Sequence, residues 1–124
     1  MGKTILIVDD EPNIVESLEF LMGREGFVTI VAGDGEGALL AMESRKPDLV
    51  LLDVMMQGKD GYEVCRQIRA TPEWQQAKII MLSAKSRDTE IAKGFAVGAD
   101  AYITKPFSSK ELVQEVHKVL GARP

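Results

Sequence analysis

The sequence predicts an α/β domain of three layers, in which a parallel sheet of five strands carries helices on both faces. Two observations support this prediction. Short runs of Ile, Val and Leu alternate along the chain with longer amphipathic stretches, and the residues within each run are apolar at consecutive positions. A strand that is apolar on both faces fits a sheet that helices cover on each side. Strands and helices that alternate in this way form βαβ units with right-handed crossovers.

The expected elements follow from this alternation. Strands are expected at residues 4–8, 27–31, 48–52, 78–82 and 100–103, and helices at residues 12–24, 35–45, 61–70, 88–97 and 108–120. Pro12 suits a first helical turn, where its missing N–H has no partner to lose, and Gly26 is placed to end the same helix. For the last helix, Ser108 or Ser109 can serve as the N-cap, ahead of an apolar stripe at helical spacing.

Length and composition predict one domain over residues 1–124, with 121–124 as a candidate start of a linker. The chain has 124 residues, of which 45% are hydrophobic, and this is enough for an ordinary packed core. Its net charge of −4 argues against a basic face for nucleic acid. The lone cysteine, Cys65, cannot form an internal disulfide and is expected to be a small packing residue in a reducing compartment. No apolar run approaches the ~20 residues that span a bilayer, so we expect a cytoplasmic location without a membrane partner.

Charged and hydroxyl side chains follow four of the expected strands. They are Asp9 and Asp10 after the first strand, Asp53 after the third, Ser83 after the fourth and Lys105 after the fifth. Ligands of an open parallel sheet collect outside the carboxyl ends of its strands. If these strands are neighbours, the side chains converge into a cluster that suits a hard cation and a phosphoryl group. Mg²⁺ fits such a cluster because it prefers oxygen ligands.

Three of these residues also have an ordinary structural interpretation. Asp10 can serve only as a cap of the helix that begins near Pro12, and Asp53 can be a turn residue. Most lysines are simply solvated, and this is the alternative for Lys105. A cis peptide bond at Lys105–Pro106 would favour the functional interpretation, because it would aim the lysine side chain in a fixed direction.

Two further features resemble functional motifs but are interpreted structurally. Residues 33–38 read GDGEGA, which matches GxGxxA of dinucleotide-binding proteins, with Asp53 at a suitable distance further on. That fingerprint belongs to the first βα turn, whereas residues 33–38 lie in the second, so we expect a tight turn with Asp34 as a helix cap. His117, the only histidine, is expected to be a solvated residue of the last helix, where its position favours the helix dipole.

Four segments together resemble the receiver domain of two-component response regulators. They read ILIVDDEP at 5–12, LVLLDVMM and DGYEV within 49–64, IIMLSAKS at 79–86, and GADAYITKPFSSKELV at 98–113. The segments stand in the order of that family and cover nearly the whole chain. The resemblance implies a flavodoxin-like fold with strand order 2-1-3-4-5, which agrees with the five βα units expected from the pattern.

The resemblance also implies a metal site. Asp53 would be the phosphoacceptor, and it would receive its phosphoryl group from a sensor histidine kinase or a histidine phosphotransfer protein. Asp10 would bind Mg²⁺ directly and Asp9 through a metal-bound water. Met55 would contribute only its backbone carbonyl.

Three further residues would convert the modification into a response. Lys105 would pair with the phosphoryl oxygens, and Ser83 would hydrogen-bond to the phosphoryl group. Tyr102 stands at the aromatic switch position of the fifth strand, although an ordinary core or edge aromatic remains the alternative. Ser83 moving toward the phosphoryl group would free volume beneath the fourth helix, into which Tyr102 would turn.

The implied function is a phosphorylation-switched signalling domain rather than a turnover enzyme. It would have at most weak self-phosphorylation and autodephosphorylation activity. The face made by the fourth helix, fifth strand and fifth helix would control a downstream protein or an attached output domain, without direct nucleic-acid binding by this domain. A phosphorylation-dependent homodimer through the same face is one candidate assembly.

The chain departs from the family in two places. Gln57 stands where the family commonly has proline, so we expect the loop 57–60 to be more flexible. Asp100-Ala101-Tyr102 lacks the second acidic residue of the winged-helix transcription-factor subgroup. Gln114-Glu115 also stand in the stretch where that subgroup often has an arginine. A charged dimer contact of that subgroup is therefore less secure here.

Two other functions remain open on the sequence. A flavodoxin-like enzyme would be a flavin or nucleotide binder, or a phosphohydrolase with Asp53 as its nucleophile. Against the phosphohydrolase, Val54-Met55 leaves no acid two residues after Asp53 to protonate a leaving group, and an acidic face would repel a flavin phosphate. The second alternative is a degenerate receiver that acts as a fixed docking module, which the complete set of acidic, hydroxyl and lysine residues argues against.

Overall fold

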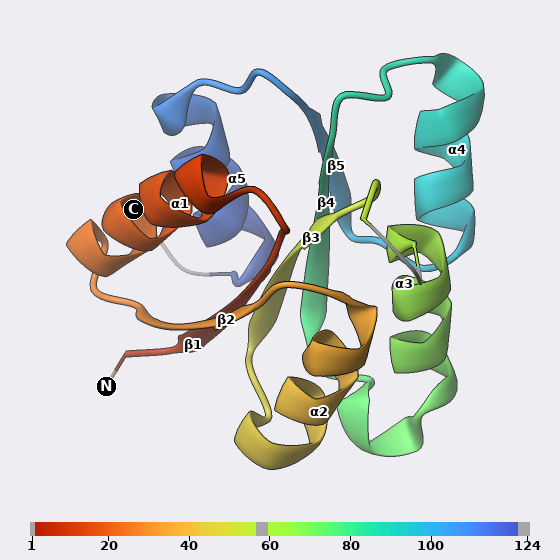
Figure 1. The fold of residues 1–124 in the computed structure, drawn as a ribbon, viewed down its shortest axis with the longest axis horizontal. Helices are drawn as coiled ribbons and strands as arrows, with labels where there is room; N and C mark the ends of the chain where they lie inside the picture. Colours follow the sequence, from red (N-terminus) through yellow and green to blue (C-terminus); the bar gives the residue numbers. More distant parts are fainter. Residues whose placement is uncertain (1, 57–59, 122–124) are drawn as a thin grey trace.

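The protein forms a parallel five-stranded sheet with helices on both faces (Figure 1). The computed structural model describes residues 2–56 and 60–121. The strands are β1 (Thr4–Val8), β2 (Val28–Ala32), β3 (Leu49–Asp53), β4 (Lys78–Ser83) and β5 (Ala101–Thr104). The helices are α1 (Pro12–Arg24), α2 (Gly35–Arg45), α3 (Gly61–Ala70), α4 (Asp88–Ala96) and α5 (Ser109–Val119). The strand order β2-β1-β3-β4-β5 confirms the predicted three-layer doubly wound fold.

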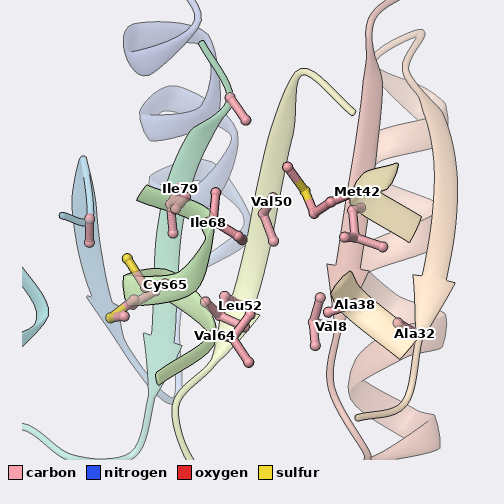
Figure 2. Packing of buried hydrophobic residues seen from close by; sticks show 14 of the residues in the cluster. Val8, Ala32, Ala38, Met42, Val50, Leu52, Val64, Cys65, Ile68 and Ile79 are labelled. Atoms are coloured by element: carbon pink, nitrogen blue, oxygen red, sulfur yellow. The ribbon is translucent and has the colours of Figure 1, made fainter. Parts of the chain in front are cut away.

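Two apolar clusters lie on opposite faces of the sheet, because successive strand residues point to opposite sides. Leu6 and Val8 of β1 belong to the cluster under α2 and α3, whereas Ile5 and Ile7 belong to the cluster under α1 and α5. Figure 2 shows the first cluster, in which Met42 of α2 and other helix residues pack on the central strands. The strand runs are therefore apolar at consecutive positions because both faces of the sheet are covered.

Cys65 is part of this packing. Its side chain is fully buried among the residues that α3 places on the sheet, as Figure 2 shows. The expectation that it is a small packing residue is confirmed.

Several predicted helix ends are confirmed. Pro12 occupies the first turn of α1, and Gly26 has a φ of 91° just beyond the end of that helix. The Asp34 carboxylate accepts a hydrogen bond of 2.7 Å from the Gly37 N–H at the start of α2. The Ser108 hydroxyl likewise accepts a hydrogen bond of 3.0 Å from the Glu111 N–H at the start of α5.

The boundaries differ from expectation by one residue at several ends. The main consequence concerns β3 and β4, whose last residues are Asp53 and Ser83 themselves, so both side chains are held by the sheet rather than by a following loop. A short 3-10 turn at Pro72–Trp74 falls where no element was expected. Gln57, the basis of the expected flexible loop, lies outside the described residues, and so does most of the candidate linker at 121–124.

None of the helices in residues 2–56 and 60–121 combines the length and the apolar character that crossing a membrane requires.

Candidate functional site

The register of the sheet brings the predicted site residues to one edge. Val8 pairs with Leu52, so Asp9 continues β1 beside Asp53 of β3. Asp53 pairs with Leu82, and Ser83 of β4 pairs with Thr104 of β5. Lys105 follows Thr104 directly, and its N–H donates a hydrogen bond of 2.7 Å to the Ser83 carbonyl. The carboxyl ends of these strands therefore gather acidic, hydroxyl and basic side chains that lie far apart in the sequence.

Three carboxylates form the centre of the site. One carboxylate oxygen from each of Asp9, Asp10 and Asp53 lies within 4.8 Å of the others. Asp9 and Asp53 are buried, whereas Asp10 is exposed. Like charges this close repel one another unless a cation offsets them. Three oxygen donors in one small space, one of them open to solvent, are a donor set that Mg²⁺ accepts.

Asp10 does not cap α1. The N-cap of that helix is Glu11, which makes no side-chain capping hydrogen bond. The Asp9 carboxylate instead accepts a hydrogen bond of 2.9 Å from the Glu11 N–H and so fixes the chain as it leaves β1. The interpretation of Asp10 as only a helix cap is therefore wrong, because the helix begins one residue too late for it.

Lys105 supplies the positive charge at the buried side of the cluster. Its Nζ lies 3.0 Å from Asp9 Oδ2, 3.5 Å from Asp53 Oδ1 and 3.8 Å from Glu11 Oε1, and its side chain is 13% exposed. Burial by itself lowers the pKa of Lys105, but its hydrogen bond to Asp9 and the charges of Asp53, Asp9 and Glu11 outweigh burial and leave the pKa raised. The Lys105–Pro106 peptide bond is cis, as the functional interpretation of the sequence expected. Lys105 is thus not a solvated lysine.

Asp53 is the carboxylate whose ionisation the site opposes most clearly. Burial and then the neighbouring Asp9 charge raise the pKa of Asp53 from 3.8 to about 6, although Lys105 and the Met55 N–H act in the opposite direction. That N–H donates to Asp53 Oδ1 over 3.3 Å. Lys105 alone therefore does not neutralise the cluster, and Asp53 would become easier to ionise if a further cation were bound.

Ser83 and Tyr102 both form hydrogen bonds with the backbone of Lys85. The Ser83 hydroxyl accepts a hydrogen bond of 3.0 Å from the Lys85 N–H, and the Tyr102 hydroxyl donates one of 2.9 Å to the Lys85 carbonyl. Among the described residues, Ser83 is therefore bonded to the β4–α4 connection and not to Asp53. The half-buried Tyr102 packs against the cluster under α3, so its side chain links that connection to β5.

A cleft of about 380 Å³ opens beside the carboxylates. The residues that line it come from three loops and from the start of α3: Asp10, Val54, Met55, Met56, Asp60, Tyr62 and Lys85. Asp60 is the N-cap of α3, and its carboxylate accepts a hydrogen bond of 2.9 Å from the Glu63 N–H. The cleft therefore combines an apolar wall with charged groups of both signs next to the acidic cluster.

Sequence reasoning missed two residues of this region. Glu11 lies close enough to Lys105 to form an ion pair, and Tyr62 lines the cleft with only 4% of its surface exposed. Tyr62 stands inside the DGYEV segment, which carried the family resemblance without receiving a role of its own. Their contacts join residues far apart in the chain and have no local sequence signal.

His117 belongs to a different part of the molecule, and the prediction that it is solvated is wrong. Its side chain is 12% exposed, and Nε2 lies 2.9 Å from Glu25 Oε1 just beyond the end of α1. Its ring centroid lies 5.6 Å from that of Phe27. The helical pattern placed His117 on the polar side of α5, but the end of α1 covers that position.

A family model and two curated relatives assign this chain to the same family. The family model described as the response regulator receiver domain matches residues 5–117. The DNA-binding response regulator MtrA of Mycolicibacterium smegmatis is 46% identical over 116 residues, which are 94% of this chain and 50% of that protein. The alkaline phosphatase synthesis transcriptional regulatory protein PhoP of Bacillus subtilis is 45% identical over 120 residues, 97% of this chain and 49% of that protein. The chain thus spans about half the length of these relatives.

The fold has solved counterparts as well. The crystal structure of a response regulator from Chloroflexus aurantiacus superposes with a TM-score of 0.93 at 36% identity, and the match covers 98% of this chain and 99% of that one. Sequence and structure therefore point to the same family over almost the entire chain.

Proposed function

This chain belongs to the response regulator receiver family of two-component signal transduction, and we propose that Asp53 accepts a phosphoryl group from a histidine. The observation that carries this proposal is the buried Asp53 carboxylate at the end of β3, with Asp9, Asp10 and Lys105 around it. A carboxylate can act as a nucleophile toward phosphorus when its charge is exposed to the phosphoryl group and not to bulk water.

The proposed reaction is a transfer without net redox change. An oxygen of the Asp53 carboxylate forms a bond to phosphorus while the phosphorus–nitrogen bond of a partner's phosphohistidine breaks. The imidazole nitrogen keeps the electron pair of that bond. Phosphoryl transfer depends mainly on positioning and on neutralising charge on the phosphoryl oxygens, and Lys105 is placed to supply part of that charge.

The carboxylate cluster fits a magnesium ion. Asp10 and Asp53 would bind the ion directly, Asp9 through a water, and Met55 through its backbone carbonyl. This assignment is supported by the convergence of the three carboxylates and by the position of Met55 beside them on the cleft. When bound, Mg²⁺ would offset the charge of the carboxylates and of the phosphoryl oxygens.

Ser83, Lys105 and Tyr102 would carry the response. The new phosphoryl oxygens would compete for the Ser83 hydroxyl and for the Lys105 ammonium, which now contact the Lys85 N–H and Asp9. Because Tyr102 also bonds to Lys85, a displaced Ser83 would shift the β4–α4 connection and the aromatic ring together. This is a shift between two arrangements, and its size is limited by the contacts that the phosphoryl group gains.

We further propose that the domain signals through its partners rather than by turnover. A sensor histidine kinase or a histidine phosphotransfer protein would donate the phosphoryl group. The face of α4, β5 and α5 would then control a separate protein or an attached output domain, and a phosphorylation-dependent dimer is one form that this control would take. Self-phosphorylation and autodephosphorylation would be weak, and a cytoplasmic location suits these partners.

Phosphorylation by a small donor tests the function. The protein is incubated with Mg²⁺ and acetyl phosphate or phosphoramidate, and its intact mass is measured before and after hydroxylamine treatment. We expect one phosphoryl group that hydroxylamine removes, and none in Asp53→Asn or after chelation of the metal. A protein that gains no phosphoryl group under these conditions would favour a fixed docking module, and full labelling of Asp53→Asn would place the nucleophile elsewhere.

A further inference from the structure

Tyr62 connects α3 to the first turn of α4 from inside the protein. It is the second residue of α3, and only 4% of its surface is exposed. Its hydroxyl donates a hydrogen bond of 3.1 Å to the backbone carbonyl of Glu90 in α4. The two residues are 28 positions apart, so this bond joins two helices directly.

A second contact reaches the same face of α4. Lys93 Nζ lies 4.4 Å from the centroid of the Tyr62 ring, within the range of a cation–π interaction. Glu90 and Lys93 are three residues apart and are therefore neighbours on the helix surface. The Tyr62 side chain thus contacts α4 through its hydroxyl and through the face of its ring.

Tyr62 and Tyr102 hold the two ends of one segment. The Tyr102 hydroxyl is bonded to the Lys85 carbonyl, and the Tyr62 hydroxyl is bonded to the Glu90 carbonyl. Lys85 Nζ also lies 3.5 Å from Glu90 Oε2, which closes the segment 85–90 on itself. Burial and then the neighbouring Tyr102 phenol raise the pKa of Tyr62 to about 12, as expected for a phenol that is held away from water.

Two other bonds from α3 hold the far end of α4, from Cys65 Sγ to the Val97 carbonyl over 3.4 Å and from Arg69 Nε to the Gly98 carbonyl over 2.8 Å. Gly94 is the buried residue of this helix, and a Cβ there would lie 2.8 Å from Tyr102 Cδ2 and 3.1 Å from Met81 Sδ. Glycine is unfavourable inside a helix, so its place here marks a close approach of α4 to the Tyr102 ring. Because glycine has no side chain, this close approach cannot by itself fix the first turn of α4, whereas the Tyr62 hydroxyl bonds directly to that turn.

We propose that Tyr62 is a positioning residue for the response of this domain. Its hydroxyl and ring hold the first turns of α4 against α3, so that α3 as well as β5 sets the position from which α4 moves when Asp53 is phosphorylated. The part that concerns phosphorylation rests on the proposed function. The anchoring of α4 is a property of the unmodified protein and is tested separately.

The first experiment measures amide hydrogen exchange by NMR in the unmodified protein. Tyr62→Phe keeps the buried ring and removes only the hydroxyl. We expect the amides of Glu90 and Ile91, both bonded to the Arg87 carbonyl, to exchange roughly fivefold faster, the factor expected for the loss of one net hydrogen bond. Lys93→Met, which removes the cation over the ring, should accelerate the same amides to a smaller extent.

Thr71→Val is the matched control. The Thr71 hydroxyl donates a hydrogen bond of 2.9 Å to the Gln67 carbonyl at the other end of α3, so this variant also removes one bond to a helix carbonyl. Exchange in α4 should not change. Unchanged exchange of Glu90 and Ile91 in Tyr62→Phe, or equal acceleration in Thr71→Val, would overturn the anchoring.

The second experiment adds Mg²⁺ and acetyl phosphate. An anchor that favours the unmodified arrangement lowers the population of the arrangement that the phosphoryl group favours, and a small donor reacts in proportion to that population. Tyr62→Phe should therefore become phosphorylated at least twofold faster than the parent, and its unmodified Glu90 and Lys93 signals should lie closer to those of the phosphorylated parent. Parent-like rates and signals would overturn the role in the response. A parent that takes up no phosphoryl group would refute the proposed function instead, and the exchange experiment would still decide whether Tyr62 anchors α4.

Discussion

At the scale of single residues, the site is defined by an excess of negative charge. The carboxylates of Asp9, Asp10 and Asp53 converge, and Lys105 is the cation whose ammonium lies against two of them. Because the site is buried, water does not compensate the negative charge that Lys105 leaves unpaired. The raised pKa of Asp53 is the direct consequence, and it makes both the stability of the protein and its affinity for a cation depend on this one group.

Without metal, Asp53 should destabilise the fold at neutral pH. Below pH 3.8 both the folded and the unfolded chain hold its proton, between pH 3.8 and about 6 only the folded chain does, and above that the fold must carry the charge. Stability contributed by this group therefore falls as the pH rises through that window. Asp53→Asn should be more stable than the parent above pH 6, by at most about 3 kcal/mol.

Urea unfolding in chelator from pH 4 to 8 measures this difference. The advantage of Asp53→Asn should grow between pH 4 and 6 and then level off. Glu19→Gln, which changes an exposed carboxylate of α1, should run parallel to the parent. If the stability of Asp53→Asn also runs parallel to that of the parent, the fold does not oppose ionisation of the Asp53 carboxylate.

Asp10 should decide whether a cation stabilises the protein. A ligand that binds only the folded state stabilises it by mass action, by about 2.7 kcal/mol at one hundred times its Kd. Thermal unfolding during a Mg²⁺ titration should therefore shift upward in the parent and little in Asp10→Ala. Glu11→Ala removes an equal charge from the next residue and should retain most of the shift. Equal shifts in the parent and in Asp10→Ala would remove Asp10 from the metal site.

At the scale of elements, the sequence predicted nearly the whole architecture. The strands are apolar on both faces and the helices are amphipathic, so each element is encoded within its own residues, as are the caps Asp34 and Ser108. The carboxyl-end rule also placed Asp53 and Lys105 correctly at one edge. The contacts of Tyr62 with Glu90 and of His117 with Glu25 could not be foreseen, because they span 28 and 92 positions.

The backbones of β3 and α3 approach closely at the Gly61 position near the site. A Cβ on Gly61 would lie 2.7 Å from the Val54 Cα and even closer to the Asp53 carbonyl oxygen, and backbone atoms cannot rotate away. Glycine lets α3 begin directly over the end of β3. The position of the Asp53 peptide therefore depends on Gly61.

Gly61→Ala should lower the free energy of unfolding by about 1–3 kcal/mol or more, the usual cost of overpacking. Gly23→Ala is the matched control, because Gly23 lies in α1 with no atom within 4 Å of the added Cβ. It should stabilise the protein by up to about 1 kcal/mol through helix propensity. Urea unfolding of both variants measures the two effects, and equal stabilities would contradict the close contact.

At the scale of the whole molecule, the described contacts form a path from the carboxylates through the β4–α4 connection to Tyr102 of β5. Lys105 N–H is bonded to the Ser83 carbonyl, the Ser83 hydroxyl to the Lys85 N–H, and the Lys85 carbonyl to Tyr102. A charge added at Asp53 acts first on the Lys105 ammonium, which lies 3.5 Å away. The two arrangements of this path, rather than any single bond, would constitute the response.

Lys105→Ala should separate modification from response. Asp53 and the neighbouring carboxylates of Asp9 and Asp10 remain, so we expect phosphorylation to persist at a reduced rate. Phosphate-dependent NMR shifts of Tyr102 and of residues 88–97 should shrink sharply, because this variant lacks the ammonium that would pair with the phosphoryl oxygens at the end of β5. Lys110→Ala, an exposed lysine of α5, should keep both. Shifts equal to those of the parent at equal phosphorylation would assign the coupling to Ser83.

We propose that the carboxyl edge of the sheet holds a phosphoryl acceptor at Asp53. Borohydride reduces an acyl phosphate to an alcohol, so treating the phosphorylated protein with borohydride and sequencing its peptides by mass spectrometry locates the modified residue directly. We expect homoserine in place of Asp53 and an unchanged aspartate at every other position. Reduction at Asp9 or Asp10, or a phosphoryl group recovered on His117, would contradict it.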